Sequence, residues 1–151
     1  MGIKNWSTKI TVEKTIMEIE NILAKHGATH IFKMYDSNGT PTALAFKTNY
    51  KGQEISFKLP MELEKIKIVF KNQASKGNIP KRLWDDEEQA RRTGWRIIKD
   101  WIDSQMALIE INVVRFEEIF LPYMYDAKNN ETLFEKLEKK DFNLQLEYKE
   151  E

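Results

Sequence analysis

The spacing of hydrophobic residues changes along the first part of the chain. Between Thr11 and His26 they recur every three or four residues, which predicts an amphipathic helix that Thr11 caps and Gly27 ends. Three short extended segments follow, and in the last of them apolar and polar residues alternate. Such alternation is typical of an antiparallel sheet with one buried face. The three segments are residues 29–35, 42–48 and 53–59.

Helical spacing returns in the second half of the chain. It predicts a helix over residues 60–75, then a loop, then a long central helix within residues 84–110. One side of the central helix is polar, and apolar residues fill an arc of about 140° on the other. An arc this wide indicates a helix wrapped by other elements, with Ile97 and Trp101 in the core.

The ends of the later helices can also be predicted. Asp85 is suited to cap the central helix in a D-x-x-E box with Glu88, and Asn130 is suited to cap a last short helix through Lys139. Between them, residues 111–125 are strongly apolar and fit a strand, a helical continuation or both.

The order α-β-β-β-α, a long α and a mixed C-terminal section predicts an α+β fold. The expected architecture is a three-stranded antiparallel sheet covered by helices, with the long central helix packed against it. We expect residues 1–151 to form a single domain, with residues 1–10 as a loose arm unless Ile3, Trp6 and Ile10 tie it down. Residues 141–151 form an acidic tail.

Composition narrows the class of protein. With 41% hydrophobic and 11% aromatic residues, 151 residues are enough to bury a core. The absence of cysteine excludes disulfides and cysteine chemistry. No apolar run reaches the roughly 18–20 residues of a membrane span, and the N-terminus lacks the apolar centre of a signal peptide. We therefore expect no membrane partner and a cytoplasmic location.

Charge is balanced overall but unevenly distributed. Residues 71–99 carry eight Lys/Arg against four Asp/Glu, whereas residues 116–151 carry five against ten. This asymmetry fits either an acidic tail beside a basic face or two ordinary solvated surfaces.

The sequence offers little for catalysis or metal binding. The two histidines, His26 and His30, flank Gly27, which is expected to end the helix between them, so their spacing does not favour a metal site. The sequence has no nucleophile elbow and no phosphate-binding glycine loop. Adjacent carboxylates on a helix point in different directions, which argues against acid–base catalysis. We expect no enzyme, cofactor or metal.

A basic segment with tryptophans is the best candidate for a binding surface. Lysine and arginine neutralise phosphates, and an exposed tryptophan offers a face on which a base stacks. Arg92, Arg96 and Lys99 share the polar stripe of the central helix and could track a nucleic-acid backbone together. The predicted nucleic-acid-binding residues are Arg82, Trp84, Arg91, Arg92, Arg96 and Lys99, within a wider set that includes Lys76, Lys81 and Trp95.

Residues 11–75 share their element order with the double-stranded-RNA-binding domain. The basic start of the second helix that marks that family is absent, because Glu62 and Glu64 stand there. We therefore do not assign this family.

Two segments, VEKTIMEIENILAKHGA (12–28) and ARRTGWRIIKDWIDSQMALIE with EEIFLPYM (90–124), resemble a family of small phage and prophage proteins of unassigned activity. The resemblance implies a viral setting and a host-cell location but no mechanism. In that setting two functions compete. One is a helper of phage DNA replication or recombination that binds single-stranded nucleic acid without sequence preference. The other is an anti-defence inhibitor that binds a host protein or a small signalling molecule.

Self-association is expected as well. A three-stranded sheet has two edges, and two further segments are apolar enough to pair with a neighbouring chain. These segments are residues 111–116 and 142–148.

Overall fold

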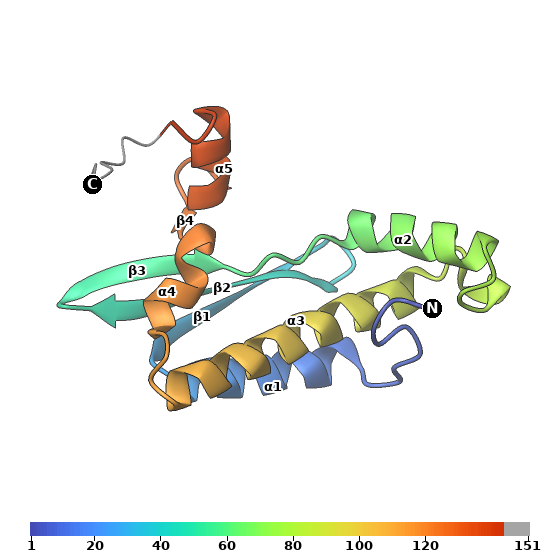
Figure 1. The fold of residues 1–151 in the computed structure, drawn as a ribbon, viewed down its shortest axis with the longest axis horizontal. Coiled ribbons are helices and arrows are strands. Elements are labelled where there is room, and N and C mark those ends of the chain that lie inside the picture. The colour runs from blue at the N-terminus through green and yellow to red at the C-terminus, as the bar shows by residue number, and fades with distance from the viewer. Residues whose placement is uncertain (144–151) are drawn as a thin grey trace, which may run out of the picture.

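A three-stranded antiparallel sheet with helices packed on one face organises the chain (Figure 1). The computed structural model describes residues 1–143. It confirms the predicted α+β class, the strand order β1-β2-β3 and the long central helix α3. The helices are α1 (Val12–Lys25), α2 (Leu63–Ser75), η1 (Lys81–Leu83), α3 (Glu87–Glu110), α4 (Phe116–Phe120), η2 (Leu121–Tyr123) and α5 (Leu133–Lys139). The strands are β1 (Ala28–Tyr35), β2 (Pro41–Tyr50) and β3 (Gln53–Lys58), with a small hairpin of β4 (Tyr125–Asp126) and β5 (Glu131–Thr132).

Local signals define α1 and the turn after β1 as predicted. The Thr11 side chain accepts a hydrogen bond from the Lys14 amide, and Gly27 follows the helix with φ +116°. In the β1–β2 turn the Asp36 carboxylate accepts from the amides of Asn38 and Thr40 at 2.9 and 3.0 Å. These bonds fix the hairpin and therefore the register of β1 on β2.

The main core lies between the sheet and the helices α1 and α3. Leu44 and Phe46 of β2 and Phe57 of β3 face this layer and are almost completely buried. The Phe46 ring packs against Phe57 and Phe120, with centroids 5.3 and 5.1 Å away. Aromatic residues from the sheet and from α4 therefore close the core at one end of the long helix (Figure 1).

The buried face of α3 differs from the prediction. Trp95 is 0% exposed, although it belongs to the wider set of residues predicted to contact nucleic acid, and Met106 is buried as well. Ile97 and Trp101, predicted in the core, are only partly buried. The positions of α1 and the sheet explain which side of α3 is buried. Because α1 and the sheet cover the Trp95 side, Ile97 is left beside a cavity of about 350 Å³ that Met61 and Ile66 also line.

Residues 1–10 are held against α3 rather than loose. The buried Gln89 side chain donates to the carbonyls of Trp6 and Thr8 at 2.7 and 2.8 Å, and Thr93 Oγ1 donates to the Asn5 carbonyl at 3.1 Å. The arm thereby contributes to a second apolar cluster between α2 and the start of α3. Its members are Phe70, Ala74, Ile79, Leu83 and Ala90, with Ile3, Trp6, Leu63 and Ile66 packed against them.

Two predicted helix caps were wrong by one or two residues. Asp86, not Asp85, caps α3 by accepting from the Gln89 amide. Thr132, not Asn130, caps α5 and forms a capping box with Glu135. In both cases two residues close together in the sequence have side chains that can cap a helix, so the tertiary structure decides which one is used.

One of the two segments expected to pair with a neighbouring chain, residues 111–116, is not an extended strand. Residues 111–115 form a turn between α3 and α4, with Ile111 and Val113 exposed. Most of the 142–148 segment lies outside the described residues. The helix predicted from Pro60 begins instead at Leu63, so Pro60 belongs to the connector that precedes it. None of the described helices combines the length and apolar character needed to cross a membrane.

Candidate nucleic-acid interface

The polar stripe of α3 is a row of ion pairs. Arg96 Nη1 lies 2.6 Å from Glu18 Oε2 on α1, and Lys99 pairs with Asp103. The guanidinium of Arg92 donates from Nε to Gln89 Oε1 at 2.9 Å and reaches Glu88. The three cations are only 17–26% exposed, so most of each side chain is unavailable to a ligand.

Arg91 has a comparable position at the start of the helix. Its Nη2 lies 3.3 Å from Glu87 and 3.5 Å from Asp36 in the β1–β2 turn, and its side chain is 15% exposed. The amide of Thr40 lowers the pKa of Asp36, and Asn38 and Arg91 act in the same direction, so this carboxylate stays ionised beside the arginine. Arg91 therefore links the sheet to α3.

These contacts assign a structural role to four of the six predicted binding residues. Arg91, Arg92, Arg96 and Lys99 were expected to lie on an exposed stripe. They lie instead where α1, the β1–β2 turn and acidic residues of α3 itself surround them. A phosphate would have to displace a carboxylate from each of them, which weakens any contact.

The other two residues, Arg82 and Trp84, lie on an open surface beside α2. Trp84 is 47% exposed, and Lys71 Nζ of α2 lies 4.8 Å from the centroid of its ring. Lys81 and Arg82 belong to η1 and Lys76 follows α2, and all three side chains are exposed. We call the set Lys71, Lys76, Lys81, Arg82 and Trp84 the Trp84 surface.

The Trp84 surface carries free positive charge. Within residues 1–143, no carboxylate forms an ion pair with any of its four cations. The negative charges nearest in sequence are partly committed, because Asp86 caps α3 and Glu87 pairs with Arg91 and Lys67. Asp85 remains exposed next to Trp84. The set therefore combines an open aromatic ring with unneutralised lysine and arginine.

The local fold explains why these side chains point outward. Ile79 and Leu83 are 3% and 2% exposed and anchor the α2–α3 connection in the second apolar cluster. Gly77 has φ +77°, which turns the chain back after α2. With both anchors directed inward, the residues between and beside them project into solvent. Sequence reasoning missed Lys71 because it lies on a different helix, and no spacing rule connects it to Trp84.

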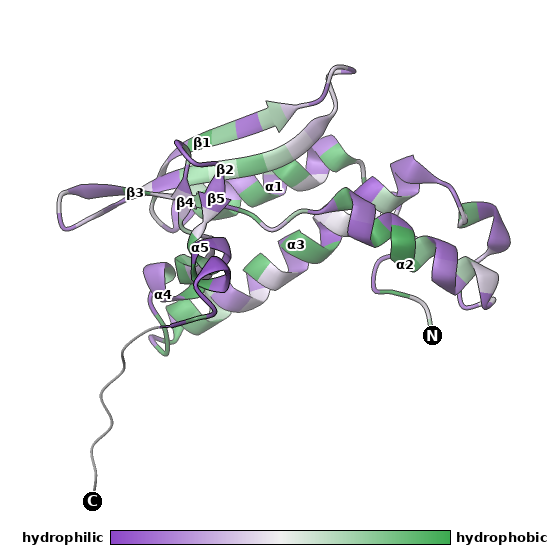
Figure 2. Cartoon of the chain, turned by 90° about the horizontal axis from the view of Figure 1, so that it is seen from above, coloured by the Kyte–Doolittle hydropathy of each residue, from purple (hydrophilic) through white to green (hydrophobic). Residues whose placement is uncertain are grey.

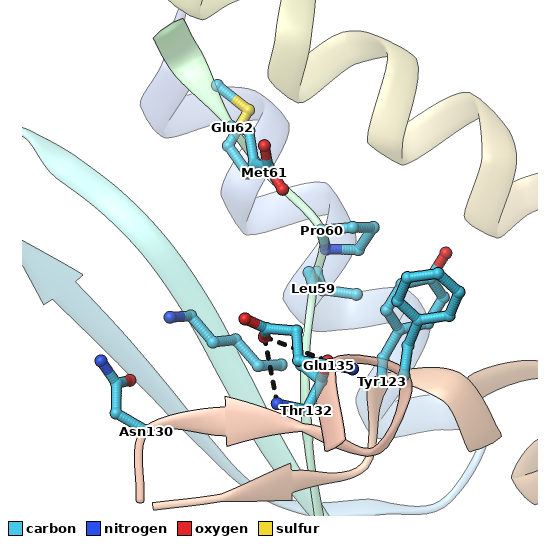
Figure 3. A pocket seen from close by; sticks show the side chains of 10 residues that line it. Leu59, Pro60, Met61, Glu62, Tyr123, Asn130, Thr132 and Glu135 are labelled. Carbon is cyan, nitrogen blue, oxygen red and sulfur yellow. Dashed lines mark hydrogen bonds between the residues drawn. The ribbon is translucent and has the colours of Figure 1, made fainter. Parts of the chain in front are cut away.

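A cavity of about 330 Å³ lies between the connector after β3 and the C-terminal elements (Figure 3). Lys58, Glu62, Tyr123, Asn130 and Glu135 contribute its polar groups. Most of these groups already have internal partners. Glu135 accepts from the Thr132 amide, Glu62 pairs with Lys65, and Asn130 accepts from Tyr125. The polar groups therefore serve helix capping and surface pairing and do not converge on a ligand.

The part of the chain that the structure describes has no cluster of side chains suited to binding a metal ion. His26 Nδ1 lies 2.8 Å from the Ile22 carbonyl at the end of α1, whereas His30 lies on β1 beside Phe32. No three His, Asp or Glu side chains among residues 1–143 are grouped so that they could hold a metal ion.

Comparison with known proteins adds no relative: no family model, no curated protein and no solved structure matches the chain. The arrangement that remains for functional assignment is the Trp84 surface. Its chemistry suits a polyanion that also carries flat aromatic groups.

Proposed function

We propose that the protein binds single-stranded nucleic acid without sequence preference, through the Trp84 surface. The observation that carries the proposal is a half-exposed tryptophan with Lys71 over its ring and with exposed Lys76, Lys81 and Arg82 near it in the chain. None of these four cations has an acidic partner among the described residues. Stacking on an indole ring depends little on base identity, and lysine and arginine contact phosphates whatever the sequence.

Single strands fit this surface better than duplexes. In a duplex the base faces are stacked on one another and unavailable to Trp84, whereas a single strand exposes them. The cations of α3, which a groove-binding helix would need free, are engaged with acidic residues. The biological setting that we propose, phage DNA replication or recombination, rests on the sequence resemblance alone.

Fluorescence anisotropy of a labelled single-stranded oligonucleotide, measured at low and at physiological salt, tests the proposal. We expect affinity to fall as salt rises, with about 0.7 counterion released per phosphate contact. Trp84→Ala and the double variant Lys81→Glu/Arg82→Glu should both weaken binding strongly. The matched control is Lys14→Glu/Lys25→Glu, which changes two exposed lysines of α1 and should leave binding nearly unchanged. Absence of binding at low salt would refute the proposal.

The second candidate, a phage inhibitor that binds a host protein, has one observation in its favour. Ile111 and Val113, in the turn after α3, are 66% and 63% exposed, and large apolar side chains at such exposure are common in protein contacts. A host protein retained by the wild type, and lost with Val113→Asp but not with Trp84→Ala, would favour this candidate over nucleic-acid binding.

A further inference from the structure

Strand β1 forms an edge of the sheet. It pairs with β2 on one side, and β2 and β3 complete the order β1-β2-β3. Seen from above in Figure 2, β1 is the outermost strand on its side, with no described element beyond it. Its outer edge therefore presents backbone groups that no neighbouring strand uses.

The direction of the backbone groups follows from a hydrogen bond on the other side of β2. The Leu59 amide donates to the Leu44 carbonyl at 3.0 Å, so Leu44 faces β3. In an antiparallel ladder successive residues face opposite neighbours. Ala43 and Ala45, on either side of Leu44, therefore face β1.

This assignment identifies the free groups of β1. The partners of Ala43 and Ala45 are Met34 and Phe32, so these two residues bond to β2. Ile31 and Lys33 alternate with them and direct their amides and carbonyls away from the sheet. The pairing of β1 with β2 is regular from His30 to Met34, and the register shifts on either side of this stretch. His30 to Met34 is therefore a regular strand edge with which another strand could pair.

The edge lysine does not protect this strand in the usual way. An exposed lysine on an edge strand discourages pairing by its charge and hydration. Lys33 Nζ, however, lies 2.7 Å from Glu20 Oε1 on α1, and this bond also raises the pKa of the lysine. Its charge is thereby drawn towards the helical layer and neutralised, while Phe32 on the opposite face of the strand is 45% exposed.

We propose that β1 pairs antiparallel with β1 of a second copy of this chain, about a two-fold axis that passes beside Phe32. In this register Ile31 lies opposite Lys33 of the partner subunit, and each of these residues exchanges backbone hydrogen bonds with the other. Phe32 lies opposite Phe32 of the partner subunit at a position where side chains approach closely. A register centred on Lys33 would place two lysines opposite each other, which is less favourable.

Size-exclusion chromatography with light scattering tests the pairing. The wild type should change from the monomer mass of 17.9 kDa towards twice that value as its concentration rises to several hundred micromolar. Lys33→Pro removes the outward amide without breaking a bond to β2, and edge positions of this kind tolerate proline. This variant should remain monomeric. Lys33→Ala loses the same contact with Glu20 but keeps the amide, so it should dimerise like the wild type.

Charged substitutions at Phe32 test the register independently of the Lys33 variants. Phe32→Asp and Phe32→Lys should each be monomeric, because like charges meet at the axis, and a mixture of the two should form a heterodimer. Circular dichroism establishes that each variant is folded, and the Phe32 pair decides the matter if Lys33→Pro does not fold. A wild type that stays monomeric, a folded Lys33→Pro that dimerises, or charged variants that each dimerise alone would overturn the proposal.

Discussion

Replacing Trp95 with alanine should destabilise the protein more than the same change at Trp101. Trp95 is 0% exposed in the layer between α1, α3 and the sheet. A tryptophan buries about 150–250 Å², and at about 25 cal/mol per Å² this corresponds to about 4–6 kcal/mol. An extended unfolded chain overestimates the buried area, so we expect a loss of about 3–5 kcal/mol in the free energy of unfolding.

Trp101 is less deeply buried than Trp95. Its ring meets Phe120 and Tyr123 at 5.7 Å, but part of the side chain remains accessible. Its replacement should therefore cost less, about 1–3 kcal/mol. Urea unfolding followed by circular dichroism measures both variants. With a slope of about 2 kcal/mol per molar urea, the midpoint for Trp95→Ala should fall by about 2 M. A loss below about 1 kcal/mol for Trp95→Ala, or a greater loss for Trp101→Ala, would show that the other face of α3 is inward.

Three further predictions concern the contacts around α3 and the C-terminal hairpin. Gly94→Ala should leave the free energy of unfolding within about 1 kcal/mol of the wild type in a urea titration, because alanine favours the helix by about 1 kcal/mol and offsets the cost of crowding. The added Cβ would overlap Ile66 Cδ1 and lie 2.8 Å from Met61 Cε, but both atoms end flexible side chains that line the cavity and can move; a loss above about 2 kcal/mol would contradict this. A double-mutant cycle of Glu18→Ala and Arg96→Ala should give a coupling of about 1 kcal/mol, the upper end for exposed pairs, since both side chains are partly buried; additive losses would show that the pair is not formed. The hydrogen bond from Lys136, aided by Asn129, lowers the pKa of Asp126 from 3.8 to about 2. The ionised Asp126 carboxylate therefore contributes fully to stability above pH about 4, and this contribution is lost as the pH falls towards 2. The carboxyl signal of Asp126 in an NMR pH titration should show this depressed pKa, and Lys136→Ala should raise the pKa but leave it below 3.8, because the hydrogen bonds from Asn129 remain.

The elements that sequence reasoning predicted correctly depend on local signals. Thr11 marks the start of α1 and Gly27 its end, and the residues from Asp36 to Gly39 make a turn that joins two strands. Each cap or turn depends only on residues a few positions apart in the sequence, so it can be predicted without knowing the tertiary contacts. The three strands and the long helix follow from periodicity in the same way, and together they determine the α+β class.

What could not be predicted depends on contacts between distant residues. Trp95, Ile97 and Trp101 are all apolar, and only the positions of α1 and the sheet decide which of them is buried. The pairing of Arg96 with Glu18 joins residues 78 positions apart, so the stripe of α3 could be mistaken for a free basic surface. Lys71 reaches Trp84 from another helix. The sequence contained the residues of the candidate interface but not their grouping.

The measurement that tests the nucleic-acid interface most directly is the NMR signal of the Trp84 indole during titration with a single-stranded oligonucleotide. The protein has four tryptophans, and Trp84→Phe assigns the signal by its disappearance. At low salt the Trp84 signal should shift progressively and return when salt is added, because bases stack on the ring while lysine and arginine hold the phosphates. The signal of the fully buried Trp95 should stay in place as an internal control. A Trp84 signal that does not move at saturating oligonucleotide, whether or not other signals shift, would contradict binding at this surface.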